Sequence, residues 1–240
     1  MVKNRPRRGS PLHLSGAFEL FGQSYRTIRR NFEVFMVLFA INGLWALWDT
    51  LGRYVDDEPE RDWKGFLFNW MFDSSWDSPL FSSGGFMFIV SVLAVIAYLL
   101  ITIGVLRAAQ GHRISLVGLW KELIERWLWL KLIAALLLVV LYVLAGFILF
   151  IIPGVILIWR LFFVQLILID QKVGIKEAIK RSWNMTRGYG WPIYSVILVS
   201  VLLSLTTLTW IVGPILAFVL TSIYTVAPAI RYTEIKKLNG

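Results

Sequence analysis

Two apolar stretches, residues 132–169 and 191–230, are too long for a soluble core, and each is too long for one crossing of a membrane. One helical crossing of the hydrocarbon layer needs about 20 residues. A proline–glycine pair interrupts each stretch, at 153–154 in the first and at 213–214 in the second. We therefore expect an integral membrane protein in which each stretch makes two crossings joined at its Pro/Gly pair.

The composition removes several functional classes. The 240 residues are 58% hydrophobic and 16% charged, whereas a soluble domain has about 25% charged residues. The absence of cysteine excludes disulfides, thiolate metal sites and cysteine nucleophiles. The two histidines have no metal-ligand spacing, and no catalytic motif is present, so we assign no catalytic, cofactor-binding or metal-binding residue and expect no enzyme.

Charge predicts the orientation in the membrane. Most of the 24 basic residues flank the apolar stretches, in 1–30, 107–131, 170–190 and 231–240, whereas more than half of the 15 acidic residues lie in 49–85. Lysine and arginine are enriched in cytoplasmic loops. We therefore expect a cell-membrane protein with both termini in the cytoplasm. Because each basic patch adjoins an apolar stretch, we expect anionic lipid headgroups as partners and no nucleic acid.

These patterns predict an all-α polytopic membrane protein of about six transmembrane helices, arranged as three hairpins. Residues 1–15 are expected to be a disordered basic tail, and residues 16–240 a single membrane domain with an outer loop at 49–85. The expected spans are 32–48, 86–106, 132–152, 155–169, 191–212 and 215–230. Each hairpin follows a cytoplasmic interfacial amphipathic helix, and these helices are expected at 16–30, 115–130 and 174–187.

The first amphipathic helix carries a stripe of apolar residues that recur every three or four positions. The members of this stripe are Leu14, Phe18, Phe21, Tyr25, Ile28 and Phe32. Arg26, Arg29 and Arg30 lie off the stripe. Such a helix is typical of the membrane interface, where apolar side chains face the acyl chains and arginines face the headgroups.

Arg160 is the ionisable residue that lies clearly inside an expected span. A charge within the membrane is by default a candidate functional site, so Arg160 is a candidate contact for a lipid phosphate or an anionic substrate. The interpretation that we favour is that its side chain reaches the outer surface or packs between helices. Lys180, Arg181 and Arg187 form a basic rim on the helix at 174–187. These four residues are the candidate lipid or ligand contacts.

Residues 151–191 combine an apolar turn, a span with a central arginine, an acid at the end of that span and a short basic helix. The pattern consists of Pro153, Gly154, Arg160, Asp170, Glu177, Ala178, Arg181, Ser182, Trp183, Arg187 and Gly188. It resembles the membrane domain of glycerophosphodiester phosphodiesterases and of stand-alone prokaryotic relatives without an assigned activity, although Asp170 stands where we expect Glu. The hydrolase barrel is not matched, since Ile114 follows His112-Arg113 and no Glu-Asn pair occurs. The resemblance therefore implies a membrane module without the hydrolase.

Two functional hypotheses remain open. The leading one is a non-enzymatic multi-pass membrane protein with an accessory or organising role, which interacts with lipid, with a membrane-protein partner or with a second copy of itself. The alternative is a small transporter or channel that uses Arg160 and the Pro/Gly-interrupted hairpins. A cavity that reaches Arg160 would favour the transporter.

Overall fold

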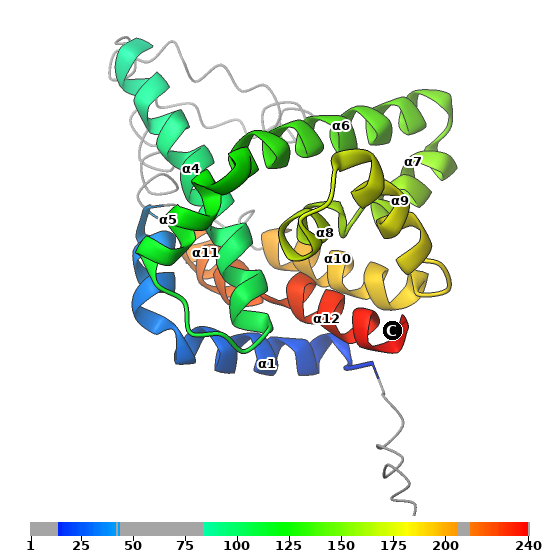
Figure 1. The fold of residues 1–240 in the computed structure, drawn as a ribbon. Coiled ribbons are helices and arrows are strands. Elements are labelled where there is room, and N and C mark those ends of the chain that lie inside the picture. The colour runs from blue at the N-terminus through cyan, green and yellow to red at the C-terminus, as the bar shows by residue number, and fades with distance from the viewer. Residues whose placement is uncertain (1–13, 42, 44–83, 206–211, 240) are drawn as a thin grey trace, which may run out of the picture.

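The computed structural model describes residues 14–41, 43, 84–205 and 212–239, and every element in this part is a helix (Figure 1). The predicted tail up to residue 13, and residues 44–83 of the predicted first span and outer loop, lie outside it. In chain order the helices are α1 (Ala17–Arg30), α4 (Gly84–Ala109), α5 (Leu116–Ile124), the 3-10 helix η2 (Glu125–Trp127), α6 (Leu128–Leu149), α7 (Ile151–Arg160), α8 (Val164–Gln171), α9 (Ile175–Met185), α10 (Gly190–Leu205), α11 (Val212–Tyr224) and α12 (Ala227–Asn239). A further apolar helix, Phe32–Ile41, follows α1.

The helices are long and apolar enough for a multi-pass membrane protein. Four candidate spans lie in the described part, at Val92–Ala109, Leu128–Leu149, Ile151–Gln171 and Ile215–Leu238. Helices α9 and α10 pass the same test together but are bent by 107°, which gives up to five spans. The all-α class expected from the sequence is therefore confirmed, with four to five candidate spans by length and composition.

The break between α6 and α7 lies three residues before the predicted Pro-Gly turn. Helix α6 ends at Leu149, Phe150 is extended with φ −164° and ψ 154°, and α7 begins at Ile151. Pro153 is therefore the third residue of α7. A proline is tolerated in a first turn because the backbone N–H that it lacks has no partner within the helix there. The predicted boundary is wrong because proline marks the start of the second helix and not the end of the first.

Two glycines let α6 and α7 approach closely. A Cβ added at Gly146 would lie 2.9 Å from the Cα of Gly154, and one added at Gly154 would lie 2.6 Å from the Phe147 ring. Both distances are shorter than a Cβ contact normally allows. Gly154 is thus required for packing between these helices, where small residues permit close contact.

Burial is uneven along the long helices. Most of the buried apolar side chains of these helices lie within 97–108, 132–135, 161–169, 193–196 and 224–235. Most of the exposed apolar side chains of these helices lie within 92–98, 137–152, 198–205 and 215–219. Figure 1 shows that the N-terminal end of α4 and the α6–α7 junction point to opposite upper corners. The helices therefore pack together at one end and separate at the other, where their apolar surface is suited to contact with lipid.

The three predicted amphipathic helices pack on the bundle with their inner faces. Their buried residues are Leu20, Ser24 and Ile28 in α1, Leu119 and Leu123 in α5, and Ala178 and Ser182 in α9. Helix α1 contacts α4, α10, α11 and α12, while α5 contacts α4 and α6, and α9 contacts α8 and α12. The apolar periodicity predicted α1 and α9 closely and located α5, but protein rather than lipid covers much of each apolar face.

The second amphipathic helix is shorter than predicted. Helix α5 begins after Ser115, whose hydroxyl accepts a hydrogen bond from the Gly118 N–H at 3.1 Å. It ends at Ile124, and Trp127 adopts the left-handed conformation with φ 58° before α6 begins. The predicted helix at 115–130 therefore merges two elements, because apolar residues continue through the turn that separates them.

Replacing Gly190 with alanine is expected to destabilise the fold by about 1–3 kcal/mol, the usual cost of overpacking. A Cβ at Gly190 would lie 1.6 Å from the Trp159 ring, which stacks on Tyr194 with centroids 5.4 Å apart. Thermal unfolding in detergent would measure the loss. Gly174→Ala is the matched control, because nothing lies within 4 Å of an added Cβ there. Equal melting temperatures for the two variants would contradict this packing.

Candidate lipid-binding site at α7 and α9

Helix α9 folds back along α8 and brings its C-terminal end to the end of α7. The turn between α8 and α9 is made by residues 172–174, and Lys172 adopts the left-handed conformation with φ 51°. Helices α8 and α9 pack against each other, with Ala178 fully buried. The predicted contacts Arg160 and Lys180 thus belong to two helices that the chain reversal places together.

Arg160 links the end of α7 to the end of α9. The chain leaves the helical path at 161–163, and the Ser182 hydroxyl donates a hydrogen bond to the Arg160 carbonyl oxygen at 2.7 Å. In return, Nη1 of Arg160 donates to the Trp183 carbonyl oxygen at 3.1 Å. A cation is favourable at a helix C-terminus. Of the alternatives drawn from the sequence, helix packing therefore describes Arg160 better than extension to the outer surface.

Two aromatic rings flank the Arg160 guanidinium, which also donates to the Trp183 carbonyl oxygen. Its central carbon lies 4.9 Å from the ring centroid of Trp159 and 5.0 Å from that of Trp183. Within the described residues, Nε of Arg160 and Nε1 of Trp159 are buried without a hydrogen-bond partner, and no acidic residue pairs with Arg160. Such a site fits an anion and not a cation. The described residues also contain no group of three or more acids and histidines placed to hold a metal ion.

The other three predicted contacts differ from one another in their surroundings. Nε of Arg181 donates to Glu177 at 2.8 Å, and its guanidinium also donates to the side-chain carbonyl of Gln171. Lys180 and Arg187 are exposed and form no ion pair with a described residue. Arg181 therefore ties α9 to α8, whereas Lys180 and Arg187 remain available to an anion outside the protein.

Asp170 organises a hydrogen-bond network that sequence reasoning missed. Its Oδ1 accepts from Nε2 of Gln110 at 2.7 Å, and its Oδ2 accepts from the Tyr232 hydroxyl at 2.7 Å and from Lys236. The Asp170 side chain is only 8% exposed. These bonds join α8 to α12 and to the residue after α4. The position of this acid at the end of an apolar run indicated a polar site, but nothing in the sequence indicated which residues donate hydrogen bonds to it.

The same network continues into α5. Nη1 of Arg107 donates to the side-chain carbonyl of Gln110 at 3.1 Å, and the Arg107 guanidinium forms an ion pair with Glu122 through both carboxylate oxygens. Together with Asp170 and Arg181, these contacts form a polar layer across α4, α5, α8, α9 and α12. This layer lies at the packed end of the bundle.

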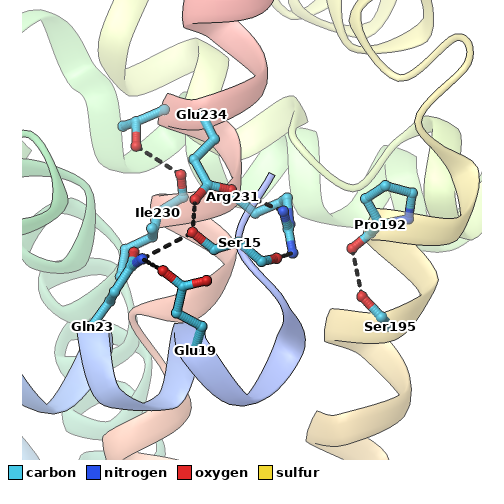
Figure 2. A network of polar contacts seen from close by, with 9 residues as sticks. Ser15, Glu19, Gln23, Pro192, Ser195, Ile230, Arg231 and Glu234 are labelled. Carbon is cyan, nitrogen blue, oxygen red and sulfur yellow. Dashed lines mark hydrogen bonds and ion pairs between the residues drawn. The ribbon is translucent and has the colours of Figure 1, made fainter. Parts of the chain in front are cut away.

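A buried arginine fixes the start of α1 to α12 (Figure 2). Arg231 is 1% exposed, and its guanidinium donates to Glu234 at 2.8 Å and to the Ser15 carbonyl oxygen at 2.6 Å. The Ser15 hydroxyl donates to Glu234 and accepts from Gln23 at 2.9 Å. Ser15 was predicted to belong to the disordered tail, and this is wrong because Arg231 and Glu234 require its polar groups as partners.

Two cavities lie at the packed end, and neither is lined by Arg160. One of about 60 Å³ lies between the ends of α5, α6 and α8, next to Glu125 and Lys172. The other, of about 400 Å³, is an open cleft between the end of α4 and α12, lined in part by Gln110, Lys236 and Lys237. These two cavities give no access to the arginine that the transport hypothesis requires.

Comparison of the chain with protein-family models, with curated proteins and with solved structures finds no match. The resemblance of residues 151–191 to the membrane domain of glycerophosphodiester phosphodiesterases therefore stays a prediction. The structure adds a physical role for some of the residues that carry it, since Arg160, Ser182 and Trp183 join α7 to α9.

Proposed function

We propose that this chain is a non-enzymatic multi-pass membrane protein with an accessory or organising role, and that it binds the phosphate groups of anionic lipids at the packed end of its bundle. One observation carries the proposal. Lys180 and Arg187 are exposed and form no ion pair with a described residue, although the inner face of α9 is already buried against the bundle. Their charge therefore faces outward.

The surroundings of α9 support a lipid partner. Further cations are exposed without an ion pair in the described part, namely Arg29, Arg30, Arg113, Lys121, Lys176 and Lys237. Trp183 and Trp191 beside Arg187 are 42% and 80% exposed, as expected of aromatic residues at a membrane interface. Near an anionic leaflet each lysine or arginine contributes about 1 kcal/mol of binding free energy.

The proposal includes the finer topology expected from the sequence. Six spans in three hairpins would place both termini and all three amphipathic helices in the cytoplasm of the cell membrane. The position of the packed end supports this arrangement, because α1, α5 and α9 all lie there together with the basic segments. Transport remains the second hypothesis, and no observation at Arg160 favours it.

Reversing both outward charges, Lys180→Glu with Arg187→Glu, is expected to reduce stabilisation by anionic lipid. The measurement is the shift in melting temperature when phosphatidylglycerol or phosphatidylcholine is added to the protein in detergent, since a ligand that binds the folded state raises its stability. The melting temperature of the unmodified protein should rise with phosphatidylglycerol but not with phosphatidylcholine, and the rise should be smaller at high salt.

Lys180→Arg with Arg187→Lys is the control, because it keeps both charges and should keep the response. An undiminished response of the charge-reversed variant to phosphatidylglycerol would overturn the proposed site. An equal response of the unmodified protein to phosphatidylcholine would overturn the preference for anionic lipid.

A further inference from the structure

Helix α1 presents two exposed edges beside its buried face. Leu20, Ser24 and Ile28 are buried, whereas Phe18 is 89% and Tyr25 51% exposed. Because Phe18 and Tyr25 are seven residues apart, they lie on the same edge of the helix, which we call the aromatic edge. The basic edge consists of the exposed residues Arg26 and Arg30. It lies next to the aromatic edge, on the side away from the buried face.

Contacts at both ends prevent α1 from rolling to bury its aromatic edge. At its start, Ser15 is held by Arg231, Glu234 and Gln23 (Figure 2). At its end, Oδ1 of Asn31 accepts a hydrogen bond from the Ile114 N–H at 3.1 Å. The aromatic edge is therefore a fixed outward surface and not a mobile flap.

The surface next to α1 indicates what covers this edge. Arg26 and Arg30 form no ion pair with a described residue, so the basic edge complements an anionic surface. The chain continues directly into the apolar helix Phe32–Ile41, where Met36 is 60% exposed. An apolar surface that continues into a further apolar helix, with arginines beside it, matches the boundary between acyl chains and headgroups.

We propose that α1 is a membrane-docking helix whose aromatic edge inserts at the boundary between headgroups and acyl chains of an anionic leaflet while its basic edge binds lipid phosphates. This surface is separate from Lys180 and Arg187, so it stands whether or not α9 binds lipid. The lipid bilayer is the single occupant proposed for it.

The absence of native cysteine allows a single spin label at each chosen position. Phe18→Cys and Tyr25→Cys report on the aromatic edge, and Glu19→Cys is the matched control because it lies seven residues before Arg26 on the basic edge. The collision rates of each label with oxygen and with a water-soluble nickel chelate are measured in phosphatidylglycerol and phosphatidylcholine vesicles. Labels 18 and 25 should be oxygen-accessible, nickel-protected and about 5–10 Å below the phosphates, while label 19 should be nickel-accessible.

Nickel collisions at 18 and 25 equal to those at 19 would overturn the proposal, because the edge would face water. Protection from both oxygen and nickel would also overturn it, because protein would cover the edge. Adding Arg26→Gln and Arg30→Gln should reduce the depth of label 18 in phosphatidylglycerol vesicles and leave its depth unchanged in phosphatidylcholine vesicles. If the two substitutions leave the depth unchanged in both kinds of vesicle, the basic edge has no role in docking. The Lys180→Glu, Arg187→Glu background should change none of these readings.

Discussion

Replacing Arg231 with alanine is expected to lower the free energy of unfolding by about 3–5 kcal/mol, the cost of breaking a buried ion pair. Arg231 is 1% exposed and bonds both Glu234 and the Ser15 carbonyl oxygen. Without it, the Glu234 carboxylate keeps only a hydroxyl partner, and the start of α1 loses its link to α12. Chemical unfolding in detergent, followed by helical circular dichroism, measures the change.

The controls separate the buried charge from charge in general. Lys237→Ala removes an exposed cation from the same helix and should change stability by less than about 0.5 kcal/mol. Arg231→Met with Glu234→Met should recover part of the loss, because it leaves no unpaired buried charge. If Arg231→Ala and Lys237→Ala unfold at the same denaturant concentration, the contact between α1 and α12 is not as the structure describes.

Replacing Asp170 with alanine is expected to cost about 3 kcal/mol, somewhat less than the loss of Arg231. Asp170 accepts hydrogen bonds from Gln110, Tyr232 and Lys236, and its removal leaves all three donors without their acceptor. A hydrogen bond to a charged group contributes about 1.5–3 kcal/mol, and bonds within one network do not add. Thermal unfolding in detergent is the measurement.

Asp170→Asn keeps one acceptor oxygen, for Gln110 or for Tyr232, and loses the second acceptor together with the charge that faces Lys236. The melting temperature of Asp170→Asn should therefore lie between that of Asp170→Ala and that of the unmodified protein. Lys176→Ala, on the exposed face of α9, is the matched surface control and should change the melting temperature little. An Asp170→Ala protein as stable as the Lys176→Ala control would rule out a network that holds α4, α8 and α12 together.

The elements of this fold follow from the sequence because they depend on local patterns. Apolar length predicted α4, α6 and the α7–α8 segment, and periodicity predicted α1 and α9 to within two residues of their ends. Side-chain periodicity depends only on helix geometry, so it identifies which residues share a face. The end of α6 was misplaced because Phe150 is as apolar as its neighbours and gives no signal of a break.

The contacts of the candidate site depend on residues far apart in the chain, and this limited what the sequence could predict. Arg160 was identified as unusual, but its partner Trp183 is 23 residues away and lies beside it only because α9 reverses direction. Arg231 looked like one more terminal cation, although it is nearly completely buried. Periodicity shows that a face is apolar; whether lipid or protein covers that face is decided by tertiary packing.

Labelling of single cysteines with a membrane-impermeant maleimide tests the proposed topology most directly. Phe150→Cys lies at the α6–α7 break and is expected to react in intact cells, whereas Lys180→Cys and His112→Cys should react only after the cells are permeabilised. Both groups have exposed native side chains in the structure, so membrane sidedness is the variable that separates them. Two results would contradict six crossings with a cytoplasmic basic end. In the first, Phe150→Cys reacts only after the cells are permeabilised, as Lys180→Cys does. In the second, Phe150→Cys remains unlabelled both before and after permeabilisation.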